Sequence, residues 1–352
     1  MTYCLTQEPP GKCCFNIMSK LIIPQGYKSK LSLYETQTAI GKMKRLFEDN
    51  LARALNLNRV SAPLFVEPHT GLNDDLSGTE RPVAFDVKEM GGKVHIVHSL
   101  AKWKRMALHR YKFPVEQGIY TDMNAIRRDD EMDNLHSIYV DQWDWEKIIT
   151  PKSRNLDYLK ETVRLIVGAV CDTTERLHAI HPELTMEIKR DVTFITSQAL
   201  EDMYPNLTAK ERENAFTKKN NTVCLLQIGN KLKSGKPHDG RAPDYDDWQL
   251  NCDILLWCEV LGCAMEISSM GIRVDAETLD KQLTLSGCDN RRSLTYHKEL
   301  LAGNLPLTIG GGIGQSRLSM LLLEKAHIGE VQVSVWDKDT MEKCATAGVE
   351  LL

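Results

Sequence analysis

The segment at residues 126–146, IRRDDEMDNLHSIYVDQWDWE, begins with an arginine and acidic cluster and leads through a short turn into a strand dense with acids and amides. The carboxylates of Asp141, Asp144 and Glu146 would be hard to bury on an ordinary core strand, because an unpaired buried carboxylate is costly. Composition alone therefore favours a solvated edge strand. The alternative is a functional strand that carries polar groups on one face.

A second segment, EISSMGIRV at 266–274, places Glu266, Ser269 and Arg273 among strand-forming residues. Arginine and carboxylates make strong contacts with phosphates and with their metal ions. Asp253, in the preceding predicted strand, is positioned to share a magnesium ion with Glu266. The alternative is that both carboxylates are simply exposed on neighbouring strands.

A third segment, LTIGGGIGQSRLSMLLLEK at 307–325, is a glycine-rich turn that opens an amphipathic helix at about Gln315. Glycines at 310, 311, 312 and 314 permit close approach of the backbone to a ligand. The segment lacks the Lys-Ser/Thr ending of a P-loop and does not open an early βαβ unit as a dinucleotide-binding turn does. By itself it is only weak support for ligand binding.

Outward from these segments, the pattern predicts one domain of helices and strands. Helical spacing of apolar residues lies at 32–56, 154–181, 204–216, 276–285, 291–302 and 315–326. Strand-like runs lie at 83–87, 93–99, 118–123, 137–145, 192–196, 224–229, 253–260, 264–274 and 331–336. The extended stretch 59–68 contains Pro63, which favours a sheet edge or a partner interface. Residues 1–30 are expected to form a weakly structured extension to a single domain over 31–352.

The composition is that of an ordinary globular enzyme. A formal net charge of -4 gives no broad electrostatic reason to bind nucleic acid. No apolar run approaches the roughly 20 residues of a membrane-spanning helix, and the first residues resemble neither a secretory signal nor a transit peptide, so we expect a cytoplasmic protein without a membrane partner. The ten cysteines lack the spacing of a zinc site and are expected to be core residues in a reducing compartment.

In order and spacing, these segments resemble the catalytic core of class II aminoacyl-tRNA synthetases. LNRVSAPLF at 57–65 is similar to that family's first motif, a strand ending in proline at the dimer interface. Residues 126–146 resemble the second motif, with Arg127 in the place of the arginine that grips the α-phosphate. GGGIGQSRL at 310–318 resembles the third, with Arg317 in the place of the arginine that embraces the ATP base and terminal phosphate. The resemblance implies an α+β fold, a mainly antiparallel sheet flanked by helices, and a homodimer.

The match is closer to one branch of that superfamily, the ammonia-dependent asparagine synthetases (asparagine synthetase A, or aspartate–ammonia ligases). The segments similar to its signatures are HSLAKWKR (98–105), YVDQWDWE (139–146), RAPDYDDW (241–248), EISSMGIRVD (266–275) and IGGGIGQSRL (309–318). The resemblance runs from about residue 30 to the C-terminus. It implies that the chain makes asparagine, AMP and pyrophosphate from L-aspartate, ATP and ammonia, through a β-aspartyl-adenylate.

The same resemblance implies roles for individual residues. Those expected around aspartate are Asp74, Ser99, Lys104, Arg127, Gln142, Asp144 and Asp246. Those expected around ATP are Arg127, Asp253, Glu266, Ser269, Arg273, Gly312 and Arg317, with magnesium on Asp253 and Glu266. Arg127, Lys104, Asp74 and Asp246 are the expected catalytic residues. His98 stands beside Ser99, and a lone strand histidine of this kind is more often structural than a base.

These residue types suit the implied reaction. A carboxylate that attacks the α-phosphate is an anion approaching an anion, so cations must neutralise and align the reacting groups. Arg127 offers a planar bidentate fork, and magnesium offers a compact charge. Lys104 matches the carboxylates of aspartate, and the acidic cluster of Asp74, Asp144 and Asp246 is suited to attract ammonium and remove its proton. Which carboxylate does so is left open.

Three other functions are less consistent with the sequence. An aminoacyl-tRNA synthetase or a tRNA-modifying paralogue would use the same adenylate, but the residues before Ser32 are too few for an anticodon-binding barrel and no basic appendage follows the third motif. A catalytically silent paralogue is expected to have lost an arginine or a metal carboxylate, and Arg127, Glu266 and Arg317 are present. A glutamine-dependent synthetase needs an N-terminal cysteine, where this chain has Thr2.

Overall fold

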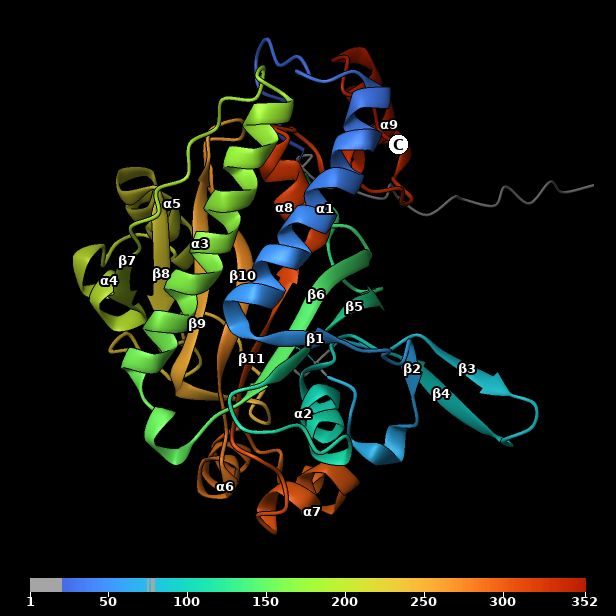
Figure 1. Cartoon of the computed structure of the whole chain (residues 1–352), viewed down its shortest axis with the longest axis vertical. Helices are drawn as coiled ribbons and strands as arrows, with labels where there is room; N and C mark the ends of the chain where they lie inside the picture. The colour runs from blue at the N-terminus through green and yellow to red at the C-terminus, as the bar shows by residue number, and fades with distance from the viewer. Residues whose placement is uncertain (1–20, 75, 77–79) are drawn as a thin grey trace, which may run out of the picture.

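An eight-stranded sheet carries the architecture of the computed structural model, which describes residues 21–74, 76 and 80–352 (Figure 1). In spatial order its strands are β1 (Leu57–Arg59), β5 (Gly118–Ile126), β6 (Tyr139–Ile148), β11 (Thr308–Gly314), β10 (Cys263–Arg273), β9 (Asp246–Cys258), β8 (Thr222–Leu226) and β7 (Thr193–Thr196). Neighbours from β5 to β8 pair antiparallel, and only the outermost strands β1 and β7 pair parallel. The predicted α+β class with a mainly antiparallel sheet is confirmed.

Two long helices, α1 (Leu33–Leu55) and α3 (Leu156–Ile180), lie side by side across one face of this sheet (Figure 1). Each begins at a side-chain cap: Ser32 forms a capping box with Glu35, and Asn155 accepts from the backbone of Tyr158. The apolar stripe of α1 packs on the strands, and the rings of Phe47 and Trp143 lie 4.7 Å apart. This face is therefore the main hydrophobic core.

The opposite face of the central strands is covered by α2 (Ala101–Arg110), which contacts β5, β6 and β11. Successive residues of a strand point to opposite faces, so Trp143 and Trp145 of β6 enter the apolar core while Gln142, Asp144 and Glu146 face α2. The remaining helices are α4 (Ser197–Met203), α5 (Ala209–Asn220), α6 (Ala276–Leu285), α7 (Thr295–Leu301), α8 (Gln315–Leu322) and α9 (Lys338–Thr346).

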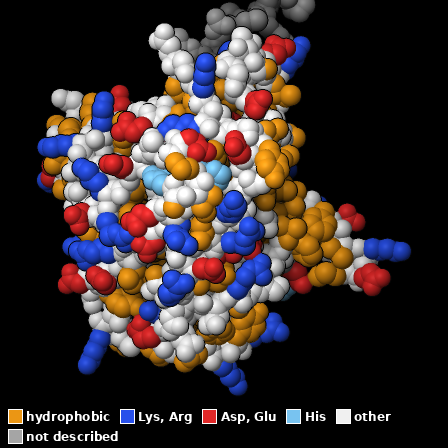
Figure 2. Space-filling model, turned by 45° about the horizontal axis from the view of Figure 1, so that its top comes forward, with side chains coloured by type: hydrophobic (Ala, Val, Ile, Leu, Met, Phe, Trp, Pro, Cys, Tyr) orange, Lys and Arg blue, Asp and Glu red, His pale blue; other side chains and the backbone are white. Residues whose placement is uncertain are grey.

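A small sheet of order β2-β4-β3 projects from the body beside β1 (Figure 1). Its strands are β2 (Phe65–Val66), β4 (Gly92–Ile96) and β3 (Ala84–Val87). Phe65 and Phe85 stack edge to face with ring centroids 5.4 Å apart, and both remain exposed. Figure 2 shows hydrophobic side chains gathered where this projection joins the body.

Two predictions about strands are wrong. The solvated edge strand favoured by the composition of 137–145 is instead β6, an interior strand between β5 and β11. The strand predicted at 331–336 is not formed: Gln332 turns inward and donates to Asp141 and Ser316, while Val333 and Val335 point outward, exposed. The alternation of residue types in this segment arises because Gln332 packs against the start of α8, not because the segment pairs with another strand.

The helix predicted at 276–285 matches α6, α5 extends beyond the predicted end at 216, and the other predicted helices are shorter than expected. Residues 291–302 divide into a 3-10 turn, Asp289–Ser293, and α7, and the helix predicted from 204 begins only after the Thr208 cap. The short helices α2, α4 and α9 were not predicted. The extended stretch predicted at 59–68 is divided: it includes the end of β1 and all of β2, each an outermost strand of its own sheet, and Pro63 lies between them outside any strand.

Residues 21–30 contain no helix or strand but contact the domain. The Ile22 backbone exchanges two hydrogen bonds with the amide of Asn134, and Lys30 lies 2.5 Å from Glu324. The rest of the predicted extension, with Cys4, Cys13 and Cys14, lies outside the described residues. None of the helices that are described is both long and apolar enough to cross a membrane. Of the cysteines described, five are buried and two are partly buried, all as free thiols.

Candidate active site

β6 pairs with β11, so the polar side chains of β6 lie beside the glycine tract of β11. Gly310, Gly311 and Gly312 stand opposite Glu146, Trp145 and Asp144 in the strand register. A Cβ atom on Gly312 would come within 2.7 Å of the Asp144 carboxylate, and one on Gly310 would collide with Glu146. Glycine is therefore required here so that the polar side chains of β6 can lie flat across the neighbouring strand.

A small cavity of about 80 Å³ opens above this polar face. Its walls come from β6, β10 and β11, from the start of α2, from the segments before β3 and β9, and from the residue that follows β5. All seven residues predicted around aspartate line it: Asp74, Ser99, Lys104, Arg127, Gln142, Asp144 and Asp246. The structure thus brings together residues that are far apart in the sequence.

Three ion pairs fix the charges in and beside this small cavity. Lys104 Nζ lies 3.2 Å from Asp144 Oδ2 and donates to the backbone carbonyl of Gly311 at 2.9 Å. Arg273 Nη1 lies 2.5 Å from Asp246 Oδ1, and its Nη2 lies 2.7 Å from Glu146 Oε2. Burial lowers the pKa of Lys104, with Asp144 opposing the shift. The pairs leave these groups rigid and partly neutralised.

Asp74 is the exception among the carboxylates of this cavity. Its side chain is 2 % exposed; Oδ1 accepts from the Leu76 backbone N–H at 3.0 Å, and Oδ2 has no hydrogen-bond partner among the described residues. Burial raises the pKa of Asp74, and the charge of Lys102 opposes the shift. His98 is buried beside it, with Nδ1 on the Asp74 backbone carbonyl oxygen, which is a structural contact.

A larger cavity of about 350 Å³ adjoins the first. The two share a wall formed by Leu76, Arg127, Gln142, Tyr245, Ser269 and Gly312. Five of the residues predicted around ATP line the larger cavity: Arg127, Glu266, Ser269, Gly312 and Arg317. Arg127 therefore stands between the two spaces, where its Nη2 donates to the His98 carbonyl at 3.2 Å and its Nε has no partner among the described residues.

The first turn of α8, which carries Arg317, is fixed to the sheet at the rim of the larger cavity. The Asp141 carboxylate accepts from the Ser316 backbone N–H at 3.0 Å and pairs with Lys44 of α1 at 3.1 Å. An anion at a helix N-terminus interacts favourably with the helix dipole and with free N–H groups. Asp141 therefore joins β6, α1 and α8 at one point.

Two residues predicted around ATP lie elsewhere. Arg273 lines the small cavity, in its pairs with Asp246 and Glu146. Asp253 lines neither cavity: it is 5 % exposed, stands opposite Ser269 in the register of β9 and β10, and pairs with Arg241 through Oδ2. Burial raises the pKa of Asp253 to about 7, with the Arg241 charge opposing and the Glu266 charge adding to the shift.

The predicted metal pair, Asp253 and Glu266, supplies two carboxylates. Asp253 Oδ1 is buried and has no partner within the described ranges, and Glu266 opens onto the larger cavity with its side chain 35 % exposed. No group of three or more His, Cys, Asp or Glu residues suited to a metal occurs among the residues described. Magnesium characteristically takes one or two carboxylates and leaves its other positions to water and phosphate, so the pair fits that ion.

Sequence reasoning overlooked several residues of the site. Tyr245 lines both cavities, and Asp239 and Arg241 line the larger one. Asp244 is fully buried and accepts from Lys102, Arg291 and His297, which anchors the loop before β9. Arg241, Asp244 and Tyr245 belong to the segment RAPDYDDW, in which only Asp246 was predicted to be a site residue.

Comparisons with known proteins show which chains are similar to this one. The family model described as aspartate-ammonia ligase matches residues 34–348. The chain is 58% identical to an aspartate–ammonia ligase of Clostridium perfringens over 336 residues, which are 95% of this chain and 100% of the relative. It is also 58% identical to that of Clostridium tetani, over 95% of this chain and 98% of the relative.

Solved structures with a similar fold are class II tRNA synthetases. The asparaginyl-tRNA synthetase of Pyrococcus horikoshii, complexed with asparaginyl-adenylate, is similar at a TM-score of 0.64 and 16% identity, over 84% of this chain and 68% of that one. The Entamoeba histolytica asparaginyl-tRNA synthetase in complex with asparaginyl-adenylate gives 0.62 and 13%, over 85% and 66%. At such identities the likeness concerns the fold.

Proposed function

The chain belongs to the aspartate–ammonia ligase family, and from that premise we propose that its two adjoining cavities form one active site. It is a ligase that uses ATP to join aspartate and ammonia into asparagine, releasing AMP and pyrophosphate. We assign aspartate to the small cavity and the nucleotide to the larger one. The observation that carries this assignment is the shared wall, in which Arg127, Gln142, Ser269 and Gly312 line both spaces.

In the first half-reaction, the β-carboxylate of aspartate attacks the α-phosphorus of ATP, and pyrophosphate leaves. Arg127, between the cavities, offers a guanidinium to the α-phosphate, where negative charge develops. Lys104 holds a carboxylate of aspartate, and its own contacts with Asp144 and Gly311 keep its ammonium in place. Holding both reactants against one wall supplies much of the rate, because the attacking and accepting atoms are already oriented.

In the second half-reaction, ammonia attacks the β-carbonyl carbon of the adenylate and AMP leaves. Ammonium must first give up a proton. Asp144 is paired with Lys104, and Asp246 is paired with Arg273. Asp74 forms no such ion pair with the described residues, and its buried Oδ2 has no hydrogen-bond partner among them, so we assign ammonium binding and deprotonation to Asp74. Its raised pKa suits a group that must accept a proton.

We assign magnesium to Asp253 and Glu266. When bound, this ion would neutralise charge on the phosphates of ATP and hold them for in-line displacement. The assignment is supported by the unpartnered Asp253 Oδ1 and by the open Glu266 carboxylate. Hard cations prefer such oxygen ligands.

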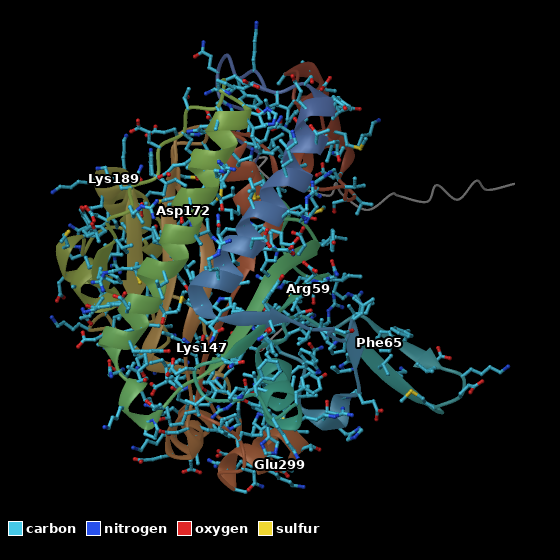
Figure 3. The ribbon with its side chains drawn as sticks, in the orientation of Figure 1. Arg59, Phe65, Lys147, Asp172, Lys189 and Glu299 are labelled. Carbon is cyan, nitrogen blue, oxygen red and sulfur yellow. The ribbon has the colours of Figure 1, made fainter. Side chains whose placement is uncertain are left out.

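We further propose a homodimer that forms through the edge of the sheet. β1 is an outermost strand and Pro63 follows it; Figure 3 shows the labelled Arg59 on β1 and Phe65 on the neighbouring small sheet. Both side chains are exposed. A mass measurement in solution tests this: a monomer that persists at high protein concentration would contradict it.

Two coarser assignments complete the proposal. We propose that residues 31–352 form a single catalytic domain, to which residues 1–30 are an extension, and that the enzyme works in the cytoplasm without nucleic acid. The family match over residues 34–348 supports the domain boundary. The net charge of -4 offers no general attraction to nucleic acid.

One assay tests the function as a whole. Purified protein is mixed with aspartate, ATP, magnesium and ammonium, and the products are separated. Asparagine, AMP and pyrophosphate should appear in equal amounts. Production of ADP and phosphate, or a requirement for tRNA, would overturn the proposed reaction.

A further inference from the structure

Arg241 has no role in the proposed reaction, although it lies in the wall of the nucleotide cavity. It belongs to the loop between β8 and β9 and lines the larger cavity, where its side chain is 11 % exposed. Nη1 lies 2.7 Å from Asp239 Oδ2 and donates to the Gly240 carbonyl at 2.8 Å, while Nη2 pairs with the Asp253 carboxylate. The guanidinium thus bridges an exposed carboxylate and a buried one.

The pair with Asp253 places Arg241 on a residue that we assign to magnesium. Asp253 is nearly fully buried, and an isolated buried carboxylate is unfavourable without a neighbouring cation. Arg241 is the basic residue that hydrogen-bonds to it, as far as the described residues extend. In this arrangement the protein itself supplies the positive charge at the metal carboxylate.

An arginine and a divalent cation compete for such a carboxylate. Two cations held a few ångströms apart in a partly buried site repel each other strongly. An Arg241 side chain displaced from Asp253 stays beside the larger cavity, because Asp239 and the Gly240 carbonyl still hold Nη1. Its freed Nη2 then faces a space assigned to a polyphosphate, the kind of anion that a guanidinium binds most strongly.

We propose that Arg241 is a third phosphate-binding arginine of the nucleotide cavity, beside Arg127 and Arg317, and that it rests on Asp253 until a divalent cation takes that carboxylate. The inference rests on the proposed positions of ATP and magnesium. It implies that Arg241 opposes binding of the metal alone and favours binding of the metal together with the nucleotide. Asp239 is the positioning residue that keeps Arg241 at the cavity.

The test measures Mn²⁺ binding by electron paramagnetic resonance, without nucleotide, at pH 8.5, where carboxylates are ionised. Arg241→Gln should bind Mn²⁺ alone at least about fivefold more tightly than the wild type, because the competing charge is gone. In aspartate-dependent exchange of labelled pyrophosphate into ATP, the same variant should show a KM for ATP raised at least about tenfold, since a charge-assisted contact is lost. Arg292→Gln, which removes a surface arginine paired with Asp280 and Asp289, should match the wild type in both measurements.

Arg241→Lys is a second variant, which tests the proposal even if Arg241→Gln does not fold. Lysine keeps the charge on Asp253 but cannot hold Asp239 and a phosphate together, so Mn²⁺ affinity should stay within about twofold of the wild type while the KM for ATP rises. Weaker Mn²⁺ binding by Arg241→Gln, or an unchanged KM for ATP in either variant, overturns the role of Arg241. A wild-type protein that fails to exchange pyrophosphate contradicts the proposed function itself.

Discussion

Arg317 Nη1 donates to the backbone carbonyl oxygen of Glu266 at 3.1 Å, which ties the start of α8 to strand β10. The carboxylate of Glu266 is farther from that nitrogen, at 3.9 Å, and opens onto the larger cavity. The backbone of Glu266 thus positions the arginine of the third motif, while its side chain is left for a ligand. The two roles can be separated by mutation.

Glu266→Gln should fold normally and keep Arg317 in place, since the contact that orients the arginine is made by the backbone. It should lose magnesium binding, because an amide keeps the shape of the side chain but removes its charge. We expect pyrophosphate exchange at limiting magnesium to fall at least about tenfold, with partial recovery at high magnesium. Full turnover at limiting magnesium would refute the metal assignment. Glu277→Gln, on the exposed face of α6, is the matched control.

Asp74→Asn separates the two half-reactions. The amide oxygen can still accept from the Leu76 backbone, so the loop should keep its conformation. Adenylate formation, followed by aspartate-dependent pyrophosphate exchange, should stay within a few-fold of the wild type, while asparagine formation falls about a hundredfold through loss of the general base. Equal losses in both assays would show that Asp74 binds aspartate instead. Asp172→Asn, on the exposed side of α3 (Figure 3), should leave both rates unchanged.

The elements best predicted from sequence are those whose pattern is long and regular. The apolar stripes of α1 and α3 fix both helices, because a 3.6-residue period over more than twenty residues has no rival interpretation. The short helix α2 was not predicted, since its buried face mixes Lys102, Lys104 and Arg105 with two alanines and a leucine. Charged side chains that are buried in ion pairs interrupt the apolar spacing from which a helix is predicted.

The position of β6 shows the same limit at the site. Composition favoured an edge strand, because burying the carboxylates of Asp144 and Glu146 is unfavourable when each residue is considered without its partners. Lys104 and Arg273, which compensate them, lie far away in the sequence. Family resemblance predicted that Asp144, Lys104 and Asp246 lie together. It did not predict the pair of Arg241 and Asp253, which depends on how the loop between β8 and β9 folds over the sheet.

His327 makes stability depend on pH. Its ring is 1 % exposed, accepts from the Gly329 N–H through Nδ1 and packs against Trp336. Burial lowers the pKa of His327 to about 4, whereas an unfolded histidine titrates near 6.5. Between these values the unfolded chain binds a proton that the folded chain does not, so this contribution is complete above about pH 6.5 and is lost as pH falls towards 4.

We therefore expect the wild type to lose about 2 kcal/mol more unfolding free energy than His327→Asn between pH 7 and pH 5. Asparagine keeps an acceptor for Gly329 but does not titrate. Urea unfolding at one protein concentration measures the difference. His69→Asn changes an exposed histidine and should keep the wild-type dependence of unfolding free energy on pH. The same dependence in His327→Asn would exclude the effect of His327.

Arg127→Lys is the most direct test of the reaction geometry. Arg127 lines both cavities, and its Nη2 is steadied by the His98 carbonyl at 3.2 Å while Nε has no partner among the described residues. Lysine retains the positive charge but loses the planar fork, so the variant separates alignment from net charge. The protein should fold normally and bind aspartate within a few-fold of the wild type.

Adenylate formation by Arg127→Lys should be at least about a hundredfold slower, comparable to the loss of one preorganised donor to a developing oxyanion. Labelled pyrophosphate exchange into ATP, with aspartate and without ammonia, isolates this step from the attack of ammonia. The adjacent Arg128 is exposed and lines neither cavity, so Arg128→Lys should exchange at the wild-type rate. If Arg127→Lys did the same, Arg127 would not act on the α-phosphate, and the assignment of the shared wall to the reacting atoms would have to be abandoned.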